Sequence, residues 1–266
     1  MLKGFTVPRS PLGAAALVPP PPWHYALDVL AVEFWSDPDA SAGVLPEGVK
    51  LDPRSTGRSV AVFADCQFTA DGEEYLDPAR YQSREFIVLL DAIWQESRIA
   101  WCPYAYTDND AAIVMGWAQG YPRKLGAIRQ TRTFAAQSAA SPPLARNSRF
   151  AGCLSAHGQP LAEARIVLHE KAGRLAVLFD RPIMARRYFP RLRAGAHDQP
   201  AVDELVLCAM DNILITDGWI GSGELSFPEA HGEELDMLGP IKVGRGYRFT
   251  LSFSVSDSEI LKDMTI

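Results

Sequence analysis

The chain has 266 residues, of which 47% are hydrophobic and 22% are charged. This composition is typical of globular proteins and excludes a disordered chain or a coiled coil. Lys and Arg number 26 against 32 Asp and Glu, which gives a net charge of -6. No basic run is long enough to bind a phosphate backbone, so we expect no nucleic-acid partner.

The cysteines and histidines show no metal or disulfide pattern. The four cysteines lie far apart without a CxxC pair, which fits a reducing, cytoplasmic environment. The five histidines share no metal-binding spacing, so we expect no metal and no other cofactor. Apolar runs are short: Phe86–Leu90, for example, ends at Asp91, far below the ~18 residues of a membrane span, and we expect no membrane contact.

The chain begins with a proline-rich segment. The run Pro19–Pro22 favours an extended polyproline conformation, which predicts that residues 1–22 form an arm. We expect this arm to lie over the body or against a neighbouring subunit and to contribute no core. No internal repeat or linker divides residues 23–266, which we interpret as one domain.

Strand-like runs dominate that domain. Turn signals at Asp71-Gly72, Ala172-Gly173, Asp217-Gly218 and Gly244–Gly246 punctuate them, which favours antiparallel pairing. The nine predicted strands are Leu27–Trp35, Ser59–Phe68, Glu85–Trp94, Ile99–Tyr106, Leu161–Leu168, Leu175–Phe179, Leu205–Ile215, Trp219–Phe227 and Tyr247–Val255.

Only a few segments have a sequence pattern that favours a helix. They are Asp37–Val44, Arg186–Leu192 and Asp110–Gln119, the last with Asp108 or Asn109 as its N-cap and Gly120 just beyond its end. We therefore predict an α+β fold that is mostly antiparallel sheet with a few short helices.

A motif follows the predicted helix at Asp110–Gln119. It reads Gly120-Tyr121-Pro122-Arg123-Lys124-Leu125-Gly126, and Lys124 is one of only six lysines. A lysine near a helix C-terminus is ordinarily a surface residue stabilised by the helix dipole. The functional interpretation is a Schiff-base amine, which requires an apolar pocket or a neighbouring cation such as Arg123 to lower its pKa from ~10.4.

At these residues the sequence resembles the acetoacetate decarboxylase superfamily. The resemblance extends to Leu45-Pro46-Glu47 and to Arg84-Glu85, which match an early turn and the start of a central strand in that family. It implies a cone-like β-barrel, a homo-oligomer, and an imine-forming pocket inside the barrel. In that pocket Glu85 is the implied carboxylate near the imine.

The lysine pair of the family is altered in this chain. The family's Schiff-base lysine is the first of the pair, and this position is Arg123, which cannot form an imine. Lys124 takes that role only if the segment is shifted, because neighbouring residues of an extended segment project to opposite sides.

Six residues are the candidates for the site, and three functions remain open. Lys124 and Glu85 are the predicted catalytic residues, and the predicted substrate-binding residues are Arg123, Tyr121, Trp117 and Arg132. The leading hypothesis is a lyase that decarboxylates a small β-keto acid through a lysine imine. The alternatives are an aldolase-dehydratase that acts on pyruvate or another 2-oxo acid through the same lysine, and a non-catalytic barrel that binds a small molecule and has lost the Schiff-base lysine.

Overall fold

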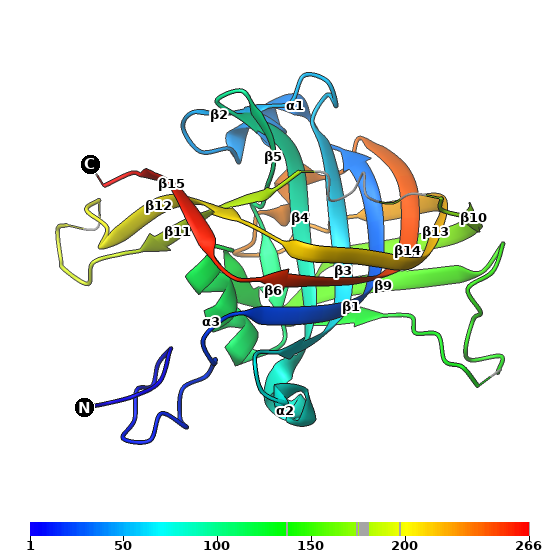
Figure 1. Cartoon of the computed structure of the whole chain (residues 1–266). Coiled ribbons are helices and arrows are strands. Elements are labelled where there is room, and N and C mark those ends of the chain that lie inside the picture. The colour runs from blue at the N-terminus through cyan, green and yellow to red at the C-terminus, as the bar shows by residue number, and fades with distance from the viewer. Residues whose placement is uncertain (137, 174, 176–180, 197, 266) are drawn as a thin grey trace.

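In the computed structural model every named strand joins one 15-stranded sheet, with a few short helices at its margins (Figure 1). The structure describes residues 1–136, 138–173, 175, 181–196 and 198–265. The strands are β1 (Trp23–Trp35), β2 (Val49–Leu51), β3 (Arg58–Thr69), β4 (Gln82–Trp94), β5 (Ser97–Trp101), β6 (Ala105–Thr107), β7 (Arg123–Leu125), β8 (Ala127–Gln130), β9 (Arg149–Ala156), β10 (Gln159–Lys171), β11 (Ile183–Phe189), β12 (Val202–Cys208), β13 (Asp211–Ser226), β14 (Lys242–Val255) and β15 (Ser258–Asp263).

The helices are short. They are α1 (Pro38–Gly43), α2 (Pro78–Tyr81) and α3 (Asp110–Gln119), with 3-10 turns at Glu74–Leu76 and Leu235–Leu238. The α+β prediction is confirmed at this level, since sheet dominates and helices are few. Among the residues described, no helix has the length and apolar character needed to cross a membrane.

The pairing is mostly antiparallel, as predicted. The main path of the sheet runs β15-β12-β11-β5-β4-β3-β1-β14-β13-β10-β9-β8, and among the described strands only β11 with β5 and β6 with β7 pair in parallel. No pairing joins β15 to β8 in the described part of the chain. The predicted closure into a cone-like barrel is therefore not confirmed.

The two faces of β1 and β3 bury different clusters. Leu27 and Val29 of β1 pair with Cys66 and Ala64 of β3, and all four side chains share one face. On the other face Leu30 and Phe63 pack with residues of β8, β9 and β10. These two strands therefore separate two compartments.

Several element boundaries differ from the prediction. Pro103 has no backbone N–H, and the predicted strand Ile99–Tyr106 divides there into β5 and β6. The predicted strand Leu205–Ile215 divides after Cys208 into β12 and β13, and Leu175–Phe179 lies outside the described residues except for Leu175.

The predicted helix Arg186–Leu192 is wrong. Arg186 and Arg187 belong to β11, where their side chains bind Asp203 and Glu204 of β12 with N···O distances of 2.6 Å. These cross-strand ion pairs join residues 17 positions apart. A local pattern does not reveal them.

Two of the predicted turns lie inside strands. Asp217 has a φ of 51° at a register shift of β13, so Asp217-Gly218 marks a bulge. In β14, a Cβ atom on Gly246 would lie 2.4 Å from Cγ2 of Ile166. The glycine permits close packing there and does not reverse the chain.

The N-terminal arm contributes to the core, contrary to the prediction. Val18 is fully buried in a cluster with Tyr81 of α2 and Ala111 and Met115 of α3. The indole N–H of Trp23 donates to the carbonyl of Pro19 at 3.0 Å. Figure 1 shows the N-terminal segment on the same side of the molecule as α3.

Candidate functional site

Helix α3 and strand β7 position the motif. The Asn109 side chain caps α3 by accepting from the N–H of Ala112, and Gly120 ends the helix with a φ of 89° in the left-handed region. After Gly120 the chain extends, and β7 pairs in parallel with β6. Arg123 and Lys124 are neighbours on this short strand, so their side chains leave it on opposite sides.

Arg123 points inward and is buried, with 7% of its side chain exposed. Its Nη2 donates to Oε2 of Glu85 on β4 at 2.8 Å, and its Nη1 donates to the carbonyl of Ala112. Burial alone would lower the pKa of Arg123, but the Glu85 carboxylate, together with smaller contributions from Tyr25, Cys66 and Tyr121, raises it. The guanidinium is therefore charged and paired with a carboxylate.

Arg123 depends on a glycine of α3. A Cβ atom on Gly116 would lie 2.2 Å from Cδ of Arg123 and 2.7 Å from its Nε. The guanidinium stem thus packs directly against the helix backbone. Only a residue without a side chain leaves room for it.

Lys124 points the other way, and 46% of its side chain is exposed. Its Nζ donates to Oε2 of Glu233 at 2.6 Å, and the hydroxyl of Tyr106 donates to the same oxygen at 2.6 Å. Burial would raise the pKa of Glu233, but these hydrogen bonds lower it below its usual value. Lys124 thus anchors the loop before Leu235–Leu238 to the sheet.

An inner cavity of about 70 Å³ lies beside Arg123 and Glu85. A volume of this size corresponds to roughly five water-sized positions. Besides the ion pair, its polar lining comes from Tyr25, Cys66, Gln119, Tyr121 and Cys208. The remaining described lining residues are apolar and come mostly from the sheet: Leu27, Val29, Val62, Ala64, Ile87, Ile183, Met210, Leu251, Phe253 and Val255.

The other titratable groups of the inner cavity are neutral at physiological pH. Burial raises the pKa of the Cys208 thiol to about 11 and that of the Cys66 thiol well above its usual value. Burial likewise raises the pKa of the phenols of Tyr25 and Tyr121. The charged groups among the described lining residues are therefore Glu85 and Arg123, which balance each other.

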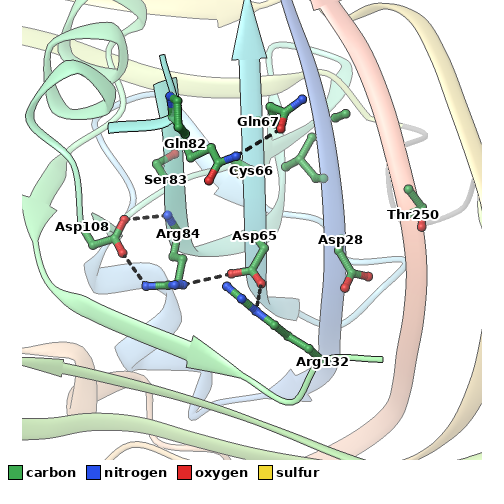
Figure 2. A pocket seen from close by; sticks show the side chains of 13 residues that line it. Asp28, Asp65, Cys66, Gln67, Gln82, Ser83, Arg84, Asp108, Arg132 and Thr250 are labelled. Carbon is green, nitrogen blue, oxygen red and sulfur yellow. Dashed lines mark hydrogen bonds and ion pairs between the residues drawn. The ribbon is translucent and has the colours of Figure 1, made fainter. Parts of the chain in front are cut away.

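A second, outer cavity of about 550 Å³ lies mainly over the opposite face of β1 and β3. Figure 2 shows its floor, a row of side chains in register across four strands: Arg84, Asp65, Asp28 and Thr250. Arg84 binds Asp65 at 3.3 Å and Asp108 at 3.1 Å. This cavity is polar, and its described charged groups form ion pairs with one another or, for Asp28, with Arg248.

The structure divides the predicted site residues between three places. Glu85, Arg123 and Tyr121 line the inner cavity, whereas Arg132 lines the outer cavity and binds Asp65 at 3.0 Å. Trp117 is half exposed, and its indole N–H donates to the carbonyl of Arg123 at 2.9 Å. Lys124 lines neither the inner nor the outer cavity.

Sequence reasoning missed several residues of the inner cavity. Tyr25, Cys66, Gln119 and Cys208 come from four different elements or their ends, and no motif marks them. Gln119 alone carried a signal, because it lies four residues before Arg123 at the end of the capped helix. Among the described residues, no cluster of His, Cys, Asp and Glu is arranged to hold a metal ion.

Together these features describe a β-rich protein with a buried ion pair in a small internal cavity. The family model for acetoacetate decarboxylase matches residues 6–264. The chain belongs to the acetoacetate decarboxylase family.

Solved structures agree with this assignment. The enduracididine biosynthesis enzyme MppR, in complex with the condensation product of pyruvate and imidazole 4-carboxaldehyde, superposes with a TM-score of 0.91 at 33% identity, covering 99% of this chain and 98% of that chain. MppR in complex with pyruvate gives 0.90 and 32%, covering 99% of each chain.

An acetoacetate decarboxylase-like enzyme from Sphingomonas wittichii RW1 shares the fold, with a TM-score of 0.89 at 22% identity over 98% of this chain and 100% of that chain. No curated protein matches the sequence.

Proposed function

We propose that this protein binds a small carbonyl compound in the inner cavity without forming a lysine imine. One observation carries the proposal: the residue of the lysine pair that enters the cavity is Arg123, held 2.8 Å from Glu85, while Lys124 Nζ is held 2.6 Å from Glu233 outside it. A guanidinium does not form an imine with a ketone. It can donate hydrogen bonds to a carbonyl oxygen.

The two imine-based functions require the amine of Lys124 inside the cavity. The parallel pairing of β7 with β6 sets Tyr106 opposite Lys124, and a shift of one residue would break the contacts of both Arg123 and Lys124. Of these two functions, the aldolase-dehydratase has the stronger support, since MppR has been solved with pyruvate and with a condensation product of pyruvate. Decarboxylation of a β-keto acid is supported by the family membership.

Borohydride trapping separates these functions. Wild-type protein, Arg123→Lys and Lys124→Ala are each incubated with pyruvate, acetoacetate or butan-2-one, reduced with borohydride, and analysed by intact and peptide mass spectrometry. We expect no adduct on wild type or Lys124→Ala, and an adduct of butan-2-one on residue 123 of Arg123→Lys, because this variant places an amine beside Glu85 in the cavity.

An adduct on Lys124 of the wild-type protein would overturn the proposal in favour of an imine-forming enzyme. Pyruvate and acetoacetate would then rank the aldolase-dehydratase and the decarboxylase. Absence of ligand binding to the wild-type protein, measured by saturation-transfer NMR with ketones and keto acids, would also overturn it.

A further inference from the structure

We propose that Arg123 and Glu85 form a proton-transfer centre that enolises a small neutral ketone or aldehyde bound in the inner cavity. This inference rests on the proposed function and adds two features to it: the charge of the ligand and a reaction. The ion pair, the cavity and the arrangement of unused hydrogen-bonding groups carry the argument.

The charge balance of the cavity selects the ligand. Its described lining holds one cation and one anion, which pair with each other, and the rest is neutral or apolar. A keto acid would bring a carboxylate into this space with no unpaired cation to meet it. Burying such a charge is far more costly than burying a neutral carbonyl group.

The size of the cavity agrees with a small ligand. About 70 Å³ accommodates a compound of roughly five non-hydrogen atoms. The apolar side chains of Val62, Ile87 and Phe253 surround the space next to the ion pair. A short ketone with an alkyl chain matches this lining.

Arg123 has donors left for a carbonyl oxygen. A guanidinium carries five N–H groups, and the hydrogen bonds of Arg123 to other described residues use one on Nη1 and one on Nη2. Its Nε is buried and has no hydrogen-bond partner in the part of the chain that the structure describes. A buried donor without a partner is costly, and a ligand oxygen would relieve that cost.

Glu85 has an oxygen left for a proton. Oε2 accepts from Arg123 at 2.8 Å, whereas among the described residues Oε1 has only a long contact of 3.5 Å from the hydroxyl of Ser83. The carboxylate is mostly buried, with 13% of its side chain exposed. One residue thus supplies a base next to the cation that binds the carbonyl group.

The step needs no other reactant. Oε1 of Glu85 takes a proton from the carbon next to the carbonyl group, and the C–H electron pair forms a C=C bond. The carbonyl π pair moves to the oxygen, where N–H groups of Arg123 stabilise the negative charge. Return of a proton from Glu85 to the same carbon restores the ketone. If the proton on Glu85 first exchanges with deuterium from the solvent, the carbon receives deuterium and is labelled.

Hydrogen exchange in D₂O tests the proposal. Butan-2-one and pyruvate, a neutral and an anionic ketone of similar size, are incubated with the protein, and loss of the α-proton signals is followed by proton NMR. We expect exchange of butan-2-one above the buffer rate and none of pyruvate. Glu85→Gln should slow the protein-dependent exchange about 100-fold or more.

The matched control is Glu233→Gln, which neutralises the carboxylate that pairs with Lys124 outside the inner cavity. We expect its exchange rate to equal that of the wild type, with circular dichroism confirming that both variants are folded. Equal loss in the two variants would overturn the role of Glu85.

Binding measured on the same samples by saturation-transfer NMR separates the two proposals. Butan-2-one that binds without exchanging overturns the enolisation and leaves the proposed function intact, whereas absence of binding of both butan-2-one and pyruvate overturns both. Faster exchange of pyruvate overturns the assignment of a neutral ligand. Exchange accompanied by a borohydride adduct on a lysine overturns the route without an imine.

Discussion

Adjacent cations on β7 form ion pairs in different surroundings. Arg123 meets Glu85 where both side chains are nearly buried, whereas the Lys124–Glu233 pair has half of the lysine in solvent and only its carboxylate buried, with 4% of the Glu233 side chain exposed. A fully buried pair is expensive to break because one partner remains charged in an apolar space, whereas a pair with one partner in water contributes less. Neighbouring residues of one motif therefore differ in what their removal should do.

The largest expected effect is that of Arg123→Ala. This variant leaves the carboxylate of Glu85 buried without its cation, which should lower the free energy of unfolding by about 3–5 kcal/mol. Urea denaturation followed by fluorescence measures it. The double variant Arg123→Met, Glu85→Gln removes both charges and should recover most of the loss; a single variant within 1 kcal/mol of wild type would mean that the pair is open to water.

A smaller effect is expected for Gly116→Ala. The added methyl group would overlap Cδ of Arg123, and overpacking of this kind costs about 1–3 kcal/mol. Gly43→Ala is the matched control, because Gly43 is also a helical glycine and a Cβ there meets nothing within 4 Å. Equal unfolding midpoints for the two variants would contradict the packing of Arg123 on α3.

Lys124→Ala should lower the free energy of unfolding by at most about 1 kcal/mol, because the lysine is half exposed and Tyr106 still donates to Glu233. The difference should shrink when the salt concentration rises. Urea denaturation at low and at high salt measures both quantities. A loss above 3 kcal/mol would mean that Tyr106 alone does not compensate the buried carboxylate of Glu233.

The cysteines should also differ between interior and surface, here in their rate of reaction with a thiol reagent. Cys153 is exposed, whereas Cys66, Cys102 and Cys208 are buried. The raised pKa of Cys208, about 11, leaves little thiolate at pH 8, so we expect one cysteine to react with an aromatic disulfide reagent in the folded protein. The other three should react after unfolding, and a fast second thiol would show that reagent reaches the inner cavity.

Local signals in the sequence predicted α3 with both of its ends, since Asn109 and Gly120 carry the chemistry of a cap and a left-handed end. They also predicted that residues 123 and 124 face opposite sides. They did not establish which of the two faces inward. That choice depends on Glu85, 38 positions away, and on Glu233, 109 positions away.

Contacts between residues far apart in the sequence also explain the other differences between prediction and structure. Arg132 follows the motif closely, yet it lies over the opposite face of β1 and β3, because the chain passes to β8 in between. Strand β9 escaped prediction since its sequence is rich in Ala, Gly and Ser, and its alternation of buried and exposed positions is evident only once its neighbours are placed. Long-range pairing thus decided what local patterns left open.

The burial of Val18 has a practical consequence for the design of shortened versions of the chain. Composition places a boundary at Trp23, but packing places it earlier, because Val18 covers Ala111 and Met115 of α3. A version that begins at Trp23 would expose the outer side of the helix that supports Arg123. The segment that is easiest to discard when choosing an expression boundary is thus part of the scaffold beneath the ion pair.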